Sequence, residues 1–199
     1  MDAVGLDLDG VLYPWHESVL THYEMYKGYT GSYTEFWGEF YKTITKDEWE
    51  FLTHVDFFYS NKLPSKKLLE FLEKVASSYE IFYISSRPGD VGLTTEQYLK
   101  RYNFPFRENL ILTDDKSSIA RLYKVKYFID DQPKHLESLS KVTKVAMKLQ
   151  PYNHDYVNMY TTVSTFEDML AFLNIRDTKL SSSAIELVTD EAALEFMKG

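Results

Sequence analysis

The stretch Asp7-Leu8-Asp9-Gly10-Val11-Leu12 follows a short apolar run, residues 3–6, and it decides how the chain folds. Side chains two apart in a strand share a face, so Asp7 and Asp9 leave a predicted strand toward one place, and Gly10 permits a sharp turn. Two adjacent carboxylates repel unless a cation lies between them or one holds a proton. The stretch therefore predicts metal binding, acid/base chemistry or both, although it also occurs as an ordinary strand and turn.

Three later segments place polar residues directly after predicted apolar strands. They are Ile81–Ile84 before Ser85-Ser86-Arg87-Pro88-Gly89, Leu110–Leu112 before Thr113-Asp114-Asp115-Lys116, and Tyr127–Ile129 before Asp130-Asp131-Gln132-Pro133. Apolar strands that end in polar residues at one edge of a parallel sheet form a crevice there. We therefore expect these segments and the first one to meet at a single site.

In this order the four segments resemble the motifs of the haloacid dehalogenase superfamily of phosphohydrolases: an Asp-x-Asp pair, a Ser or Thr, a Lys and an acidic pair. The resemblance implies an α/β fold, with a Rossmann-like parallel sheet, helices on both faces and a small helical cap inserted after the first strand. It divides the chain into a core of residues 1–14 and 63–175, a cap of residues 15–62 and a C-terminal tail of residues 176–199. Residues 189–198 of the tail are predicted as a short amphipathic helix.

The resemblance also assigns roles to the carboxylates. Asp7 would be the nucleophile that forms an aspartyl-phosphate, and Asp9 would protonate the leaving oxygen and then activate water. Mg²⁺ would be bound by Asp7, by Asp130 and by the backbone carbonyl of Asp9, because hard oxygen ligands suit this ion. Asp131 would hold a metal-bound water.

The remaining motif residues would bind the phosphate. Ser85 and Ser86 would donate hydrogen bonds to it, and Lys116 would offset the accumulated negative charge. Each also has an ordinary alternative, since the serines could cap a helix and the lysine could be a surface residue. Arg87 stands beside a proline in a turn, where it would meet either substrate or solvent.

The rest of the core is predicted as alternating helices and strands. Helices are expected near 65–78, 94–102, 116–123, 133–140 and 165–173, and strands near 142–148 and 159–163. The spacing Ser164-x-x-Glu167 predicts a capping box at the start of the last helix.

The segment between the first two motifs is too long for a simple crossover connection and is rich in aromatic residues. Ser32-x-x-Glu35 and Thr45-x-x-Glu48 predict two helices with capping boxes. Most of the rings are expected to form the core of the cap. Phe36, Trp37 and Phe40 lie on adjacent turns of one predicted helix, and one or two of them are expected to face the crevice and stack on a flat ligand.

Composition narrows the function. The chain of 199 residues has no cysteine, which excludes disulfides and cysteine-ligated zinc, and its five histidines show no metal-binding spacing, so we expect them to be surface or structural. The net charge of −8 opposes an extended nucleic-acid surface. No apolar run is long enough to span a membrane. With a predicted nucleophile at position 7 we expect no removable presequence and a cytoplasmic setting.

A closer resemblance suggests the substrate. Ile129–Pro133, the Lys of Thr113–Lys116 and Gln150–Asn153 resemble the 5′(3′)-deoxyribonucleotidase family and its bacterial and phage relatives. Gln132, where that family often has Arg, and Tyr13-Pro14-Trp15 depart from its pattern. The resemblance implies a 5′-nucleotidase-type phosphatase that uses Mg²⁺ to hydrolyse nucleoside monophosphates, with deoxynucleotides preferred.

Two other functions remain open on the sequence. One is a phosphatase acting on polynucleotide 3′ ends or another phosphomonoester, which would predict an open, basic cleft. The other is a non-catalytic interaction module, against which the intact set of Asp7, Asp9, Lys116 and Asp130 argues. The expected partner is a small phosphomonoester, and a homodimer is compatible with the sequence.

Overall fold

The computed structural model describes residues 1–175, and the helix predicted within 189–198 lies outside them. Six parallel strands form one sheet in the order β3-β2-β1-β4-β5-β6. They are β1 (Asp2–Leu6), β2 (Tyr79–Ser85), β3 (Leu110–Leu112), β4 (Val125–Asp130), β5 (Lys144–Lys148) and β6 (Thr161–Val163). The predicted α/β class and Rossmann-like sheet are therefore confirmed.

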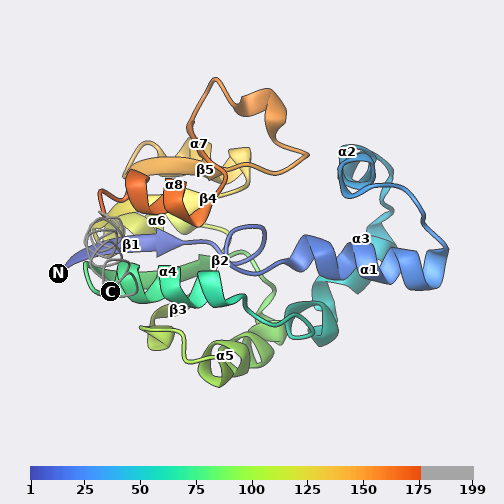
Figure 1. Cartoon of the computed structure of the whole chain (residues 1–199), viewed down its shortest axis with the longest axis horizontal. Coiled ribbons are helices and arrows are strands. Elements are labelled where there is room, and N and C mark those ends of the chain that lie inside the picture. The colour runs from blue at the N-terminus through green and yellow to red at the C-terminus, as the bar shows by residue number, and fades with distance from the viewer. Residues whose placement is uncertain (176–199) are drawn as a thin grey trace, which may run out of the picture.

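Helices cover both faces of this sheet (Figure 1). The helices on the two faces are α4 (Lys66–Ala76), α5 (Gly92–Arg101), α6 (Lys116–Leu122), α7 (Pro133–Leu139) and α8 (Phe166–Phe172). The other three, α1 (Trp15–Lys27), α2 (Tyr33–Thr43) and α3 (Lys46–His54), lie beyond one end of the strands. Alternate strand residues point to opposite faces. Val4 and Leu6 join the apolar cluster that includes residues of α4, α5 and α8, whereas Ala3 joins the cluster that includes residues of α6 and α7.

The segment between β1 and α4 forms three helices, α1 to α3, followed by a 3₁₀ turn at Asp56–Tyr59. Figure 1 shows these helices together beyond the end to which β1 points. Both predicted capping boxes are present, at Ser32 with Glu35 and at Thr45 with Glu48. The segment therefore has the helical structure expected for residues 15–62.

The start of α8 corrects the sequence analysis by one residue. The capping box is formed by Thr165 and Asp168, not by Ser164 and Glu167. The Asp168 carboxylate accepts hydrogen bonds from the backbone N–H groups of Ser164 and Thr165, at 3.0 and 2.9 Å, which fixes the first helical turn.

The strand order creates the place where a site can form. From β1 the chain crosses to β2 on one side, and β4 pairs with β1 on the other. The carboxyl ends of the strands at such a reversal border a crevice. Across residues 1–175, the helices are all too short or too polar to cross a membrane.

Candidate active site

Asp7 and Asp130 lie side by side at the carboxyl ends of β1 and β4. The backbone N–H of Asp7 donates to the carbonyl of Ile129 at 3.0 Å, which continues the pairing of the two strands by one residue. Asp130 is the last residue of β4. Both side chains are buried, and Asp7 Oδ1 accepts a hydrogen bond from the backbone of Leu8 at 2.8 Å. The strand ladder therefore fixes the position of both carboxylates.

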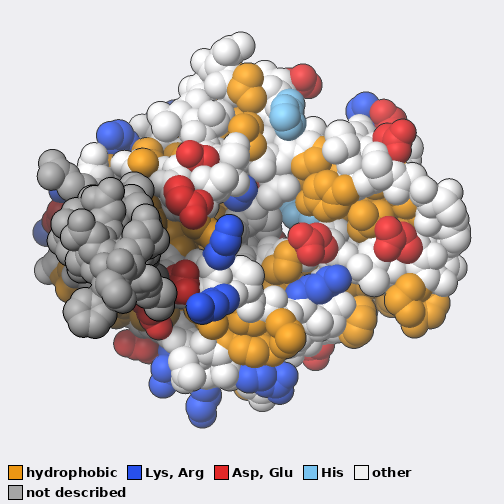
Figure 2. Space-filling model, in the orientation of Figure 1, with side chains coloured by type: hydrophobic (Ala, Val, Ile, Leu, Met, Phe, Trp, Pro, Cys, Tyr) orange, Lys and Arg blue, Asp and Glu red, His pale blue; other side chains and the backbone are white. Residues whose placement is uncertain are grey.

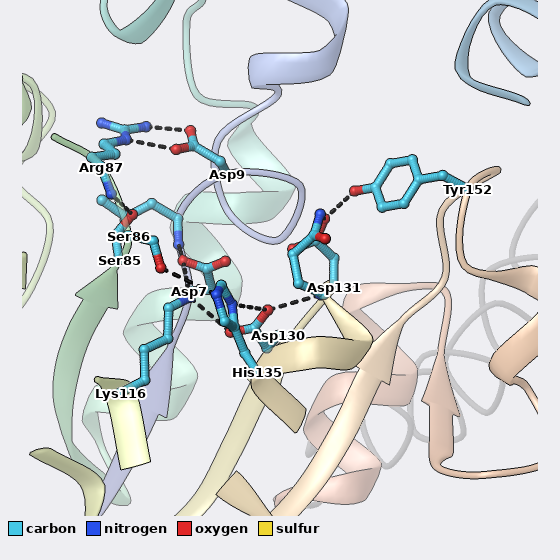
Figure 3. Close-up of polar contacts among 12 residues, drawn as sticks. Asp7, Asp9, Ser85, Ser86, Arg87, Lys116, Asp130, Asp131, His135 and Tyr152 are labelled. Atoms are coloured by element: carbon cyan, nitrogen blue, oxygen red, sulfur yellow. Dashed lines mark hydrogen bonds and ion pairs between the residues drawn. The ribbon is translucent and has the colours of Figure 1, made fainter. Parts of the chain in front are cut away.

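Lys116 lies between these two carboxylates (Figure 3). Its Nζ is 2.9 Å from Asp7 Oδ1 and 2.7 Å from Asp130 Oδ2. It is the first residue of α6, and the N-cap Asp115 sets the start of that helix by accepting the Ser118 N–H at 3.0 Å. The side chain of Lys116 is only 1% exposed. The lysine is thus a buried counter-charge and not a surface residue.

The electrostatics of this group are dominated by burial. Burial, opposed by Lys116 and assisted by the charges of Asp130 and Asp9, raises the pKa of Asp7 to about 7. Burial also acts to raise the pKa of Asp130, but Lys116 and then His135 outweigh it and hold that pKa below its usual range. Because water is excluded, the ionised forms of Asp7 and Asp130 depend on the positive charge of Lys116 beside them.

Asp131 completes a set of carboxylates that could hold a cation. Ligand atoms of Asp7, Asp130 and Asp131 all lie within 4.8 Å of one another. Burial, followed by repulsion from Asp130 and Asp7, raises the pKa of Asp131 well above its usual range. Its Oδ1 is buried, and among the described residues it has no hydrogen-bond partner. An unsatisfied buried oxygen in a set of hard oxygen donors fits Mg²⁺.

The other oxygen of Asp131 is held from two directions. Its Oδ2 accepts hydrogen bonds from the Tyr152 hydroxyl and from Gln132 Nε2, the latter at 3.2 Å. Gly10 has a left-handed φ of 78°, and a Cβ there would stand 2.5 Å from Asp131 Oδ2. The turn after β1 therefore needs glycine both for its backbone conformation and for the close approach of this carboxylate.

Asp9 is not among the three carboxylates that converge within residues 1–175. Its side chain turns to Arg87 in a two-pronged ion pair, with Arg87 Nη2 2.7 Å from Oδ1 and Nε 2.9 Å from Oδ2 (Figure 3). Arg87 was expected to meet either substrate or solvent, and the structure excludes solvent: Arg87 is buried and belongs to the residues that line the cavity over the site. Its guanidinium is buried against Asp9 because that carboxylate compensates for the lost hydration.

The predicted phosphate-binding serines follow β2 at the same edge of the sheet. Ser85 is buried, and Ser86 places its Oγ 3.3 Å from Nε2 of His135. The other ring nitrogen of His135 lies 3.3 Å from Asp130 Oδ2. The fold thus brings both serines to the crevice that also holds Asp7, Asp130 and Lys116.

A cavity of about 550 Å³ lies over this edge. The core contributes charged and polar groups to it, including Asp7, Asp9, Ser85, Ser86, Asp114, Asp131, Lys134 and His135. The helical insertion contributes mainly rings, Trp15, His16, Tyr41, Trp49, His54 and Tyr59. Apolar side chains gather on the insertion side of the molecule in Figure 2. The cavity is therefore polar on one wall and aromatic on the other.

The expectation for Phe36, Trp37 and Phe40 is wrong in detail. All three are buried in the apolar core of the insertion, at 7%, 1% and 4% exposure, and they are not among the described residues that line the cavity. They pack on one another, with ring centroids of Trp37 and Phe40 4.5 Å apart. Tyr41 and Trp49 line the cavity in their place.

No role at the site was predicted from the sequence for His135 or Tyr152, although Tyr152 belongs to the segment Gln150–Asn153 on which the closer resemblance rests. His135 lies in the first turn of α7, which begins at Pro133 directly after the acidic pair, so its ring returns to Asp130. Its position shortly after the acidic pair is a sequence signal from which its contact with Asp130 could be predicted. Tyr152 belongs to the loop between β5 and β6, and its contact with Asp131 depends on tertiary structure alone.

Two curated sequences that are similar to part of this chain are named putative nucleotidases. No family model matches the chain. A protein from Bacillus cereus named "Putative nucleotidase" is 30% identical over 104 residues, 49% of this chain and 55% of that protein. A second protein of that name, from Oceanobacillus iheyensis, is 32% identical over 82 residues, 39% of this chain and 44% of that protein. The matches thus span about half the length of these curated relatives.

Solved structures with the same fold are haloacid dehalogenase-like. A haloacid dehalogenase-like hydrolase family protein from Streptococcus pneumoniae has a TM-score of 0.57 at 13% identity, covering 87% of this chain and 98% of that one. A haloacid dehalogenase-like structure from Burkholderia xenovorans has a TM-score of 0.60 at 11% identity, covering 85% and 95%. At these identities the comparison establishes the fold, as the four motifs predicted.

Proposed function

We propose that this chain, which has the haloacid dehalogenase-like fold, is a Mg²⁺-dependent phosphatase of nucleoside monophosphates, with deoxynucleotides preferred. The observation that carries the proposal is the meeting of Asp7, Lys116, Asp130 and Asp131 beneath a cavity whose far wall is aromatic. A binding module has no need for buried carboxylates of this kind, whereas phosphoryl transfer needs them.

The reaction would proceed in two displacements at phosphorus. A carboxylate oxygen of Asp7 attacks, a bond forms between that oxygen and phosphorus, and the ester P–O bond breaks. Asp9 accepts hydrogen bonds from Arg87 through both oxygens, so the proton that it gives to the leaving oxygen would be carried on a lone pair that does not face the guanidinium. This proton is the one gained from water in the second displacement of the previous cycle. Asp9 then takes a proton from water, which attacks the aspartyl-phosphate and releases phosphate and free Asp7.

The positive charges of the site serve this chemistry. Asp7, Asp130 and Asp131, together with the backbone carbonyl of Asp9, would hold Mg²⁺, which neutralises phosphoryl oxygens when bound. Lys116 holds the nucleophile in place and offsets its charge. The hydroxyls of Ser85 and Ser86 donate hydrogen bonds to the phosphoryl oxygens.

The aromatic wall favours a nucleotide over a sugar phosphate. Tyr41 is 39% and Trp49 40% exposed, so their rings offer accessible faces on which a base can stack. The names of the two sequence relatives agree with this substrate class. Among the described lining residues, Lys134 and Arg87 are the cations other than histidine, and Arg87 is occupied by Asp9. This lining does not favour a polynucleotide end. We place the reaction in the cytoplasm.

The test is phosphate release from ribo- and deoxyribonucleoside 5′- and 3′-monophosphates, deoxyribose 5-phosphate, p-nitrophenyl phosphate and a 3′-phosphorylated oligonucleotide, each with Mg²⁺ or chelator. We expect selective, Mg²⁺-dependent release from the monophosphates. Preference for the oligonucleotide would replace the proposal with end repair. Inertness toward all of them, with the protein folded, would favour the interaction module.

A further inference from the structure

Resting on the proposed phosphatase, we propose that Arg87 is a positioning residue that fixes the acid/base carboxylate of Asp9 from behind and does not bind substrate. The residue belongs to the second motif, where its neighbours Ser85 and Ser86 are the expected phosphate ligands. On this proposal Ser85 and Ser86 bind the phosphate, whereas Arg87 next to them positions Asp9.

The guanidinium is anchored through all three of its nitrogens. Nε and Nη2 donate to the two oxygens of Asp9, and Nη1 donates to Oγ1 of Thr95 at 3.0 Å. Thr95 in turn donates to the carbonyl of Val91, the residue directly before α5, at 2.9 Å. The rigid fork therefore holds the plane of the Asp9 carboxylate relative to a helix of the core.

The exposed fractions of the Arg87 and Asp9 side chains indicate which of the two a ligand in the cavity would contact. The Arg87 side chain is 1% exposed, whereas the Asp9 side chain is 23% exposed. Asp9 and Arg87 both belong to the residues that line the cavity over Asp7, but Asp9 has by far the more accessible side chain. A ligand in the cavity would therefore meet the carboxylate, with the guanidinium behind it.

Two tyrosine rings enclose the guanidinium from different parts of the chain. Its carbon is 4.9 Å from the ring centre of Tyr13, in the turn after β1, and 4.6 Å from that of Tyr59, at the end of the insertion. The Tyr13 hydroxyl donates to Asn61 and the Tyr59 hydroxyl to the carbonyl of Thr53. Both rings are close enough to stabilise the desolvated cation where it stands. This assigns a role to Tyr13, whose segment departs from the family pattern.

The consequence for catalysis is specific to proton transfer. As Asp7 bonds to phosphorus and the ester P–O bond breaks, the leaving oxygen takes the proton of Asp9, and a misplaced carboxylate delivers it poorly. An alkoxide leaving group needs this proton, whereas nitrophenolate leaves without one. Loss of Arg87 should therefore lower kcat for one kind of substrate and spare the other.

The experiment compares Arg87→Gln and Arg87→Lys with the wild type on a deoxynucleoside 5′-monophosphate and on p-nitrophenyl phosphate. For Arg87→Gln we expect kcat on the nucleotide to fall by about 100-fold with KM nearly unchanged, and kcat on p-nitrophenyl phosphate to fall only a few-fold. Arg87→Lys keeps the charge without the fork and should show the same pattern. In an Asp9→Asn background, Arg87→Gln should have no further effect.

Two further variants keep the test valid if Arg87→Gln does not fold. Thr95→Val removes the anchor of Nη1, together with the hydrogen bond from Thr95 to Val91, and should lower nucleotide turnover a few-fold with the same substrate pattern. Arg101→Gln, on the exposed side of the same helix, should match the wild type.

A rise in KM at constant kcat, equal losses on both substrates, or additive effects with Asp9→Asn would overturn the assignment of Arg87. A wild-type protein inactive on both substrates would overturn the proposed phosphatase itself, and with it this role.

Discussion

The two walls of the cavity consist of different kinds of side chain. The sheet edge presents buried charges, Asp7, Lys116, Asp130 and Asp131, which are fixed by strand ends and ion pairs. The helical insertion presents rings that are held mainly by other rings. Charges in a desolvated site can stabilise a reacting phosphoryl group, and rings can select a flat ligand. We infer that the sheet edge performs the chemistry and that the insertion chooses the substrate.

The largest effect should come from the sheet edge. We expect Asp7→Asn to lower phosphatase activity by about 10⁴-fold or more, because an amide cannot form the aspartyl-phosphate. Its unfolding free energy without metal should not fall, since burial raises the pKa of the lost carboxyl to about 7. Urea denaturation and phosphate release measure both quantities. Asp114→Asn, which alters an exposed carboxylate of the same cavity, should retain activity.

Lys116→Met should produce the largest loss of stability. It leaves Asp7 and Asp130 buried without their cation, which costs about 3–5 kcal/mol of unfolding free energy when a buried pair loses one partner. Excess Mg²⁺ should recover part of the loss, and thermal denaturation with and without the ion measures it. Lys126→Met breaks an exposed pair with Asp2 and should leave stability nearly unchanged. Equal effects of the two variants would contradict the contrast between the buried edge and the surface.

The insertion should affect substrate choice and not the chemistry. For Trp49→Ala we expect kcat/KM on nucleotides to fall about tenfold, by loss of base stacking, with p-nitrophenyl phosphate affected far less. Phe51→Ala is the matched control, because Phe51 lies on the same helix, is 49% exposed and is not among the described cavity residues. A Trp49→Ala enzyme with unchanged nucleotide preference would remove the selective role of this wall.

The smallest effect concerns His16 of the insertion, whose ring stacks on that of Tyr152 with ring centroids 4.9 Å apart. Burial lowers the pKa of His16 to about 3, so the folded protein keeps the ring neutral while the unfolded chain protonates near pH 6.5. Above pH 6.5 the His16 ring is neutral in both states, so it does not lower the free energy of unfolding. As the pH falls from 6.5 toward 3, only the unfolded chain takes up a proton at this ring, and the free energy of unfolding decreases. Between pH 7.5 and 5.5 the wild type should lose about 1.4 kcal/mol more than His16→Phe. Parallel pH dependence of the two proteins in urea denaturation would contradict a neutral, buried His16.

The sheet edge was far easier to predict from sequence than the insertion. The four strands β1 to β4 each lead into a motif, so the local order of strand and motif predicts Asp7, Lys116 and Asp130 at one edge. The capping boxes of α2 and α3 were likewise local and are present. Such features depend on neighbours in the chain, which the sequence displays directly.

Hydrophobic periodicity does not predict which side chains of the insertion face the cavity. An amphipathic pattern shows that α2 has an apolar face, but it cannot distinguish a face buried in the cap from one facing the cavity. The sequence therefore predicts one or two of Phe36, Trp37 and Phe40 in the lining, where the structure has Tyr41. Arg87 folds back to Asp9, 78 residues away in sequence, and Tyr152 reaches Asp131 from another loop. These contacts arise only when the sheet has assembled.

Direct detection of the phosphorylated residue tests the central claim. The Asp9→Asn variant should form the acyl phosphate but hydrolyse it slowly, so acid quenching after incubation with p-nitrophenyl phosphate and Mg²⁺ should trap it. We predict that peptide mass spectrometry places the phosphoryl group on Asp7. A phosphoryl group on Ser85 or Ser86, or turnover by an Asp7→Asn enzyme, would contradict the role of Asp7 as the nucleophile at this sheet edge.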